Sequence, residues 1–85
     1  MDTFIEIEFF GKLADVAGAR STRRALTDSL TVTDLIAQLK QAEPLLGTAI
    51  DAPTTIILIN DTVSDRAAVL SKGDRLAFLP PVSGG

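Results

Sequence analysis

The chain has 85 residues, of which 46% are hydrophobic and 22% are charged, and its formal net charge is −3. A domain this short hides only about 60–65% of the surface of its unfolded chain, so a deep catalytic cleft within this chain alone is not expected. The sequence contains no cysteine, histidine, tryptophan or tyrosine, which excludes thiol nucleophiles, imidazole bases, Cys/His zinc sites and disulfide bonds.

The acidic balance argues against nucleic-acid binding, because phosphate contacts need clustered lysine and arginine. Arg20, Arg23 and Arg24 form the one basic cluster, an arrangement typical of a solvated surface. The first six residues lack the basic and apolar segments of a secretory signal, and no apolar stretch approaches the roughly 20 residues of a membrane helix. A cytoplasmic protein without membrane contact is therefore expected.

The first third of the chain predicts two strands that flank a short helix. Residues 3–10 alternate between apolar and acidic side chains, which is the period of a half-buried strand. Residues 12–17 predict a helical turn that ends at Gly18. Residues 22–28 alternate weakly and predict an edge strand that pairs with the first one.

The middle of the chain predicts the main helix. Thr31 and Asp34 have the spacing of a capping box, and apolar residues then repeat at helical spacing as far as Ala42. Pro44 prevents continuation of this helix. Residues 44–53 are expected to form a loop, in which residues 45–46 can form a short turn.

The last third predicts two strands and a local pairing. Residues 54–59 are β-branched and apolar on both faces, which is typical of a covered or central strand. A turn follows at residues 60–61, and residues 63–67 are expected to pair locally. Residues 72–74 carry a turn signal, and residues 75–79 alternate as a final strand.

This order of elements predicts an α+β fold with the β-grasp topology over residues 1–79. It consists of a mixed sheet of about four to five strands and one main helix that lies across one face. The first and last strands can pair in parallel, because the helix supplies the long crossover that parallel pairing requires.

Residues 80–85, Pro-Pro-Val-Ser-Gly-Gly, predict an extended tail. Two prolines give the chain a stiff exit from the last strand, and the six residues reach on the order of 19 Å. Glycine lacks a Cβ atom, so Gly84 and Gly85 can thread a narrow channel in another protein. The reactive group would be the terminal carboxylate, which has a pKa of about 3.5 and is inert until it is activated, for instance as an adenylate.

Four segments resemble the small, sulfur-carrying subunits of molybdopterin synthase. They are Phe-Phe-Gly-Lys-Leu-Ala-Asp at residues 9–15, Ile-Asn-Asp-Thr-Val at 59–63, Gly-Asp at 73–74 and Phe-Leu-Pro-Pro-Val-Ser-Gly-Gly at 78–85. The resemblance implies a ubiquitin-like β-grasp protein that is a non-catalytic, sulfur-donating subunit of a sulfurtransferase complex. An ATP-dependent activating enzyme would adenylate the Gly85 carboxylate, which is then converted to a thiocarboxylate.

The resemblance also implies the partners. The tail would insert into the large subunit of the synthase, in a heterotetramer with two copies of each subunit, and would deliver sulfur to cyclic pyranopterin monophosphate. No metal or cofactor is expected on this chain, since ATP is used by the activating enzyme. The tail residues expected to contact partners are Phe78, Leu79, Pro80, Pro81, Val82, Ser83 and Gly84.

The alternation of side chains between the two faces of each strand predicts a second contact surface. Phe10 shares a strand face with Glu6 and Glu8, and Leu79 shares one with Arg75. If the two strands are adjacent, Phe10 and Leu79 form an exposed apolar patch at the base of the tail, with Val63 beside them. In the family that the chain resembles, a hydrophobic sheet surface at matching positions docks both the activating enzyme and the large subunit.

Three other functions stay open. A sulfur carrier for thiamine or cysteine synthesis would share the Gly-Gly end, although the Pro-Pro-Val leader favours the molybdopterin branch. A ubiquitin-like modifier would be conjugated through Gly85 to lysines of other proteins. A plain binding module would use the sheet patch with a passive tail.

Overall fold

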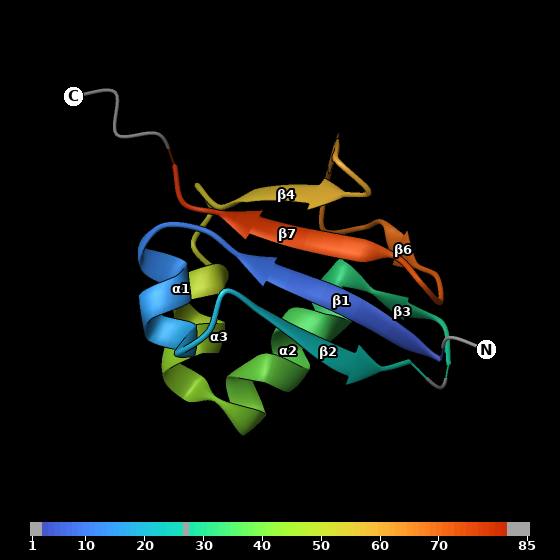
Figure 1. Ribbon diagram of the computed structural model, residues 1–85, viewed down its shortest axis with the longest axis horizontal. Coiled ribbons are helices and arrows are strands. Elements are labelled where there is room, and N and C mark those ends of the chain that lie inside the picture. Colours follow the sequence, from blue (N-terminus) through green and yellow to red (C-terminus); the bar gives the residue numbers. More distant parts are fainter. Residues whose placement is uncertain (1–2, 27, 82–85) are drawn as a thin grey trace.

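The computed structural model, which describes residues 3–26 and 28–81, has a five-stranded mixed sheet with helices on one face (Figure 1). Its elements are β1 (Phe4–Phe9), α1 (Lys12–Ala17), β2 (Ser21–Ala25), β3 (Leu30–Thr31), α2 (Val32–Ala42), α3 (Pro44–Ile50), β4 (Ile56–Ile59), β5 (Thr62–Ser64), β6 (Val69–Leu70) and β7 (Arg75–Leu79). The strand order is β2-β1-β7-β4-β5, and β3 pairs with β6 in a separate sheet. The predicted α+β fold with β-grasp topology is confirmed.

The first and last strands lie side by side at the centre of the sheet. β1 and β7 are parallel, the arrangement that the sequence analysis allows for the first and last strands. Their register places Glu6 opposite Arg75 and Phe9 opposite Phe78. The rings of Phe9 and Phe78 stack with their centroids 6.4 Å apart. This pairing joins the first and last strands at the centre of the sheet.

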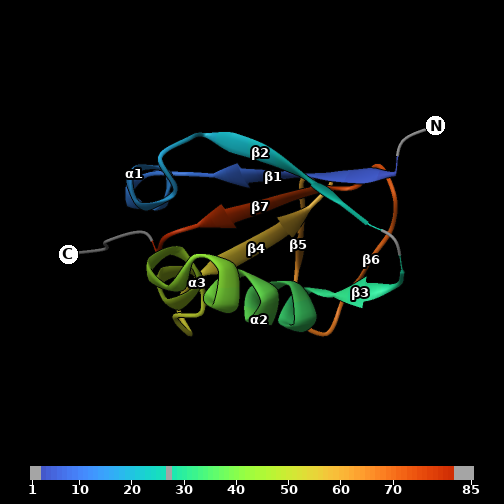
Figure 2. The same ribbon diagram turned by 90° about the horizontal axis from the view of Figure 1, so that it is seen from below.

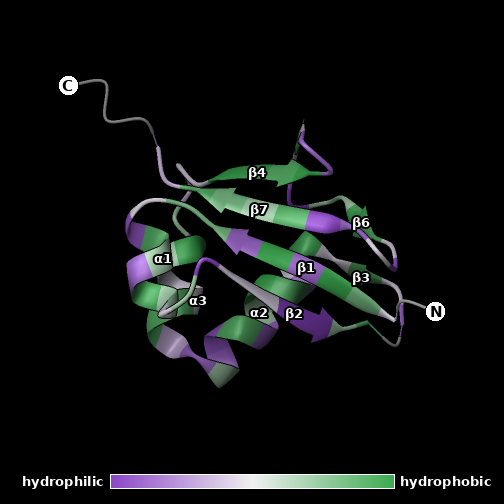
Figure 3. Cartoon of the chain, in the orientation of Figure 1, coloured by the Kyte–Doolittle hydropathy of each residue, from purple (hydrophilic) through white to green (hydrophobic). Residues whose placement is uncertain are grey.

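The core lies between the sheet and the helices. Figure 2 shows α2 and α3 on one side of the strands, and in Figure 3 the hydropathy of β1 alternates along the strand. β1 and β7 each direct alternate side chains into this core, and α2 contributes one apolar face. The buried residues include Ile5, Ile7, Phe9, Val32, Leu35, Ile36, Leu39, Ile57, Leu76 and Phe78.

The main helix begins at the predicted capping box. The Asp34 backbone N–H donates to Thr31 Oγ1 at 3.1 Å, and the Thr31 N–H donates to Asp34 Oδ2 at 3.3 Å. Two backbone donors at the helix start are thereby satisfied. No helix of the described residues is long and apolar enough to cross a membrane.

A second helix, α3, follows α2 where a loop is expected, so that prediction is wrong for residues 44–50. Pro44 ends α2 but is the first residue of α3, a position where its missing N–H costs nothing. Gly47 faces α2, and a Cβ atom there would lie 2.5 Å from Lys40 Cα. Glycine thus permits close helix packing here and does not break the helix.

The smaller strands also differ from the predictions. β2 begins and ends earlier than the predicted residues 22–28, and β3 and β6 were not predicted because each has only two residues. The predicted turn at Asn60 and Asp61 is confirmed. Both residues have positive φ angles, 51° and 68°, as a tight hairpin between β4 and β5 requires.

An ionic cluster around Asp51 joins three segments. The Asp51 carboxylate contacts Lys40 of α2 and Arg66 of the β5–β6 connection. Arg66 Nη2 also donates to the backbone carbonyls of Asp51 and Ala52, at 2.8 and 3.0 Å. The hydrogen bonds from Lys40 and then from Arg66 lower the pKa of the Asp51 carboxyl below its ordinary value.

The Gly47→Ala substitution is expected to destabilise the protein. The added methyl group collides with the Lys40 backbone, which cannot rotate away, and overpacking of this kind costs about 1–3 kcal/mol. This loss outweighs the helix propensity of alanine, which is worth up to about 1 kcal/mol. Urea unfolding measures the difference, with Thr48→Ala on the exposed side of the same helix as the control. Unchanged or increased stability of Gly47→Ala would contradict the close packing.

The Asp51→Asn substitution is expected to reduce stability at pH 7 and to have a shrinking effect in acid. Because the pKa of Asp51 is lowered in the folded state, its ionised form stabilises the fold above the unfolded pKa of about 3.9. This contribution is lost as the pH falls through the lower, folded pKa. Urea unfolding from pH 7 to pH 2 tests this, with Asp15→Asn as the control, and a wild-type advantage that persists at the lowest pH would refute it.

Candidate functional site

The base of the predicted tail is held beside the start of α1. β7 ends at Leu79, and Pro80 is half-buried while Pro81 is exposed. A Cβ atom at Gly11, whose φ is +57°, would lie 3.0 Å from Pro80 Cγ, so glycine allows the β1–α1 connection to pass close to the proline ring. The Phe10 N–H donates to the Phe78 carbonyl at 3.1 Å, which continues the β1–β7 ladder up to this point.

The remaining tail residues that the sequence predicts, Val82, Ser83, Gly84 and the reactive Gly85, lie outside the described residues. In the described part, no group of three or more histidine, cysteine or acidic side chains gathers that could hold a metal ion.

A largely apolar hollow of about 270 Å³ adjoins the base of the tail. Pro80 and Pro81 form one wall, and side chains of α1, of α3 and of the α3–β4 connection form the others. The lining comprises Lys12, Leu13, Val16, Ala49, Ala52, Thr54, Thr55, Pro80 and Pro81. No sequence pattern indicates this hollow, because residues 44–53 carry the signals of a loop and part of the wall comes from α3.

The sheet face opposite the helices carries an apolar patch. Cross-strand partners share a face, and the register places Leu79 opposite Ile56, Ala77 opposite Leu58, and Leu58 opposite Val63. Phe10 follows the Phe9–Phe78 pair and therefore lies next to Leu79. We define the apolar patch as Phe10, Ile56, Leu58, Val63, Ala77 and Leu79, of which Ala77 is only 5% exposed.

The three predicted patch residues are not all neighbours. Phe10 and Leu79 lie on adjacent strands at the base of the tail, and the Phe10 side chain is 44% exposed. Val63 is 74% exposed, but it lies on the edge strand β5 and is separated from Leu79 by β4. Ile56 and Leu58 of β4 bridge this gap, and the sequence indicated them only as an apolar run in a covered strand.

Phe78 does not belong to the predicted partner-binding tail. Its side chain is 0% exposed and stacks on Phe9. On β7 it points into the core, opposite to the faces of Ala77 and Leu79, because side chains alternate along a strand. Phe78 therefore anchors β7, and the exposed tail begins after it.

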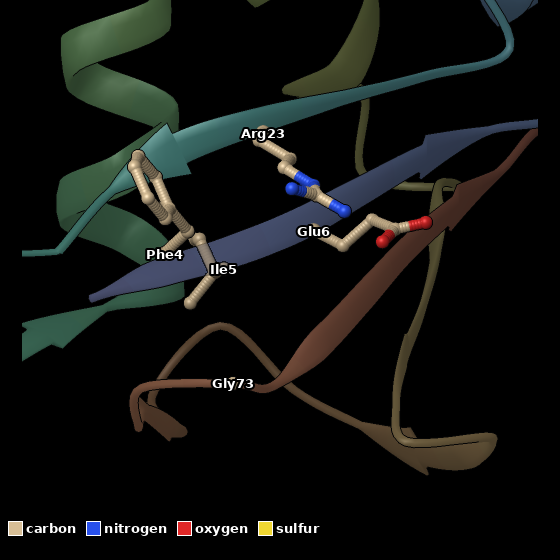
Figure 4. A pocket seen from close by; sticks show the side chains of 5 residues that line it. All are labelled: Phe4, Ile5, Glu6, Arg23 and Gly73. Carbon is tan, nitrogen blue, oxygen red and sulfur yellow. The ribbon is translucent and has the colours of Figure 1, made fainter. Parts of the chain in front are cut away.

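A charged region adjoins the apolar patch on the same face. Arg75 Nε lies 3.5 Å from Glu8 Oε1, and Arg75 also contacts the Asp61 carboxylate. Glu6 lies opposite Arg23 across the β1–β2 ladder. Figure 4 shows the Arg23 guanidinium extended toward the Glu6 carboxylate beside a small hollow of about 90 Å³, which Phe4 and Gly73 also line.

This arrangement is suited to docking and presentation. The open face combines an apolar patch with oriented charges, which is the composition of a protein interface. The tail starts at the edge of that patch, on the rigid central strand β7. A partner seated on the patch is thus placed at the start of the tail.

Comparison with known proteins identifies a family. A model of the ThiS family matches residues 7–85. The molybdopterin synthase sulfur carrier subunit of Chlamydomonas reinhardtii is 33% identical over 84 residues, which cover 95% of this chain and 98% of that protein.

The chain is also similar to an archaeal modifier protein and to one subunit of a bacterial complex. Small archaeal modifier protein 1 of Haloferax volcanii is 37% identical over 87 residues, which cover 95% of this chain and all of that protein. A crystal structure of the same Haloferax protein superposes with a TM-score of 0.80 and covers 96% of this chain and 99% of that one. A complex of subunits 1 and 2 of the molybdopterin-converting factor of Helicobacter pylori contains a chain that is 26% identical, with a TM-score of 0.66 and coverage of 96% and 99%.

The Phe78→Ala and Val63→Ala substitutions are expected to have very different effects on stability. Phe78 is fully buried, and truncation of a buried phenylalanine costs about 3–5 kcal/mol. Val63 is exposed, so its truncation changes the free energy of unfolding by at most about 0.5 kcal/mol. Urea unfolding of both variants makes the comparison, and equally small effects would argue against a core position for Phe78.

Proposed function

Because this chain belongs to the ThiS family of ubiquitin-like sulfur carriers, we propose that it is the cytoplasmic sulfur carrier subunit of molybdopterin synthase. The observation that carries the proposal is the pairing of two features at one end of the fold. The Pro-Pro-Val-Ser-Gly-Gly end follows the central strand β7, and the apolar patch lies at its base. The Chlamydomonas carrier subunit, which is similar along almost its whole length, supports this assignment.

The proposed chemistry takes place at the Gly85 carboxylate. A carboxylate oxygen attacks the α-phosphate of ATP in the activating enzyme, which releases pyrophosphate and leaves an acyl adenylate. A sulfur nucleophile then displaces AMP and leaves a thiocarboxylate. The thiocarboxylate sulfur then bonds to a carbon of cyclic pyranopterin monophosphate and displaces an oxygen substituent. Water hydrolyses the resulting thioester, which leaves the sulfur on the pterin and returns the Gly85 carboxylate, and two such transfers complete the dithiolene of molybdopterin.

The described residues would contribute positioning and not catalysis. The apolar patch would dock in turn with the activating enzyme and with the large subunit, and the complex of the two Helicobacter subunits supports a large-subunit partner. Gly11 lets the β1–α1 connection approach Pro80 closely, so the direction in which the tail leaves is restrained. A restrained tail delivers its end to a partner's channel with less loss of conformational entropy.

A second function has support of its own. Small archaeal modifier protein 1 of Haloferax is 37% identical over nearly the same length. A modifier role would use the same activated Gly85, but a lysine amine would take the place of the sulfur nucleophile and form an amide. The two roles predict different products from one adenylate.

Intact-protein mass spectrometry distinguishes these products. The full chain and a variant that lacks Gly85 are incubated with a molybdopterin-type activating enzyme, ATP and a sulfur donor. The expected result is a mass gain that corresponds to one oxygen replaced by sulfur, only in the full chain. The thiocarboxylated chain, mixed with a large subunit and cyclic pyranopterin monophosphate, is then expected to lose that sulfur.

The Asp28→Asn variant serves as the matched control, because Asp28 lies in the β2–β3 connection, away from the tail and the apolar patch. If an activating enzyme that modifies another carrier leaves the mass of this chain unchanged, the carrier role is rejected. Higher-mass conjugates through Gly85, without a free thiocarboxylate, would support the modifier instead.

A further inference from the structure

The apolar hollow beside Pro80 and Pro81, which we call the tail-base hollow, lies between two helices. Lys12 and Val16 are four residues apart and therefore share one face of α1, and Ala49 of α3 lines the hollow with them. Figures 1 and 2 show the end of β7 beside α1. The two prolines that follow β7 close this end of the hollow, so the hollow is continuous with the segment that leaves the fold.

The tail-base hollow is apolar although solvent reaches it. Leu13 is buried in the core and Ala49 packs against the core, whereas Val16 on the hollow's wall is 45% exposed. Lys12 is the one charged residue of the lining, and a lysine covers apolar surface with its methylene groups while its ammonium group stays in water. A hydrated apolar concavity of this kind gains free energy when an apolar group displaces the water.

The volume of the tail-base hollow suits a single side chain. The hollow measures about 270 Å³, which is below the range of about 300–1,000 Å³ that is typical of small-molecule sites. Protein interfaces are commonly anchored by an apolar side chain that fills a pocket of the partner. The hollow is therefore a better receptor for one aliphatic or aromatic side chain than for a free ligand.

The base of the tail has apolar surface on both of its sides. Leu79 belongs to the apolar patch on the open face of the sheet. Because side chains alternate along an extended chain, Pro80 projects to the other side, where it lines the tail-base hollow. A protein channel that encloses the chain from Pro80 onward surrounds it, so the rim of that channel meets the hollow as well as the patch.

We propose that the tail-base hollow receives one apolar side chain from the rim of the large subunit's channel, an inference that rests on the proposed function. The large subunit would then hold the base of the tail from two sides, with the apolar patch on one side and the hollow on the other. The inserted side chain would cover Val16 and pack against Pro80 and Pro81, so it would fix the direction in which the tail enters the channel.

This occupant fits the proposed function better than two others do. A second copy of the chain seated on the hollow would cover Pro81 and obstruct entry of the tail into any partner. The chain's own next apolar residue is Val82, but two successive prolines favour an extended exit and not a reversal toward the wall that they form. A side chain from the protein that encloses the tail meets neither obstacle.

Isothermal titration calorimetry with the large subunit of molybdopterin synthase tests whether the hollow must be empty. In Ala49→Leu, the larger side chain fills the hollow from within and leaves no room for the partner's side chain. The affinity is expected to fall about tenfold or more, the scale that burial of one aliphatic side chain provides. Ala37→Leu is the matched control, because it adds the same atoms on the exposed face of α2 and is expected to bind like the wild type.

A second pair of variants tests the apolar wall without filling the hollow. Val16→Ser replaces an exposed valine of the wall and is expected to weaken binding several-fold, whereas Val69→Ser replaces an exposed valine of β6, outside the hollow and the apolar patch, and is expected to have little effect. Urea unfolding verifies that all four variants are folded. If Ala49→Leu binds as tightly as Ala37→Leu, or Val16→Ser as tightly as Val69→Ser, the proposal is overturned.

These outcomes are separate from a failure of the proposed function. A wild-type chain that does not bind the large subunit would overturn both. A wild-type chain that binds and delivers its sulfur, together with an Ala49→Leu variant that matches its control, would overturn the inference about the hollow alone.

NMR of the complex identifies the occupant. Nuclear Overhauser effects are expected between the methyl groups of Val16 and Ala49 and side-chain protons of the large subunit. Effects from these methyl groups to Val82 of the same chain, or to a second copy of the chain, would assign the hollow to that occupant and overturn the proposal.

Discussion

The parallel pairing of β1 with β7 is the constraint on which the rest of the structure depends. The two strands come from opposite ends of the chain, and a parallel pair needs a long crossover that α2 helps to supply. Once they are adjacent, Phe9 and Phe78 stack inside the core, and β2 and β4 can extend the sheet on either side. The pairing also decides where the chain leaves the fold, because β7 ends beside the connection from β1 to α1.

The two faces of the sheet differ: one packs against the helices, and the other carries the apolar patch. Leu76 and Phe78 of β7 are buried against the helices, while Ala77 and Leu79 belong to the apolar patch on the other face. A single strand therefore anchors the fold and carries the base of the tail. In the proposed function this division would be useful, because a partner could engage the apolar patch and the tail without disturbing the core. The cost is an apolar surface that needs a partner to cover it.

Elements governed by local interactions were predictable from the sequence. The alternation of β1, the capping box at Thr31 and the turn at Asn60 and Asp61 depend on residues within a few positions of one another. The helix α3 was missed because Pro44 and Gly47 are read locally as breakers. Their actual roles, the first helical position and a close contact with Lys40, depend on α2 lying alongside.

The candidate site was predictable in part. The alternation of side chains along each strand indicates that Phe10 and Leu79 lie on the polar faces of their strands. The pairing of β1 with β7 brings the two residues together. The contribution of Ile56 and Leu58 to the apolar patch follows from the pairing of β4 with β5 and β7, and no local sequence pattern identifies these neighbours. Phe78 was assigned to the tail because it directly precedes the motif, whereas the direction of its side chain follows from the register.

The sequence by itself determined which side-chain chemistry this chain lacks, since it contains no cysteine or histidine, and it determined the periods of the main strands and of the main helix. The tertiary structure alone decided which residues meet. The order of the strands and the full extent of the apolar patch depend on contacts between residues distant in the chain. The role of Gly47 depends on α3 lying against α2. Local periodicity tells which face of a strand is apolar, but the long-range pairing that selects its neighbours is set by the packing of the whole core.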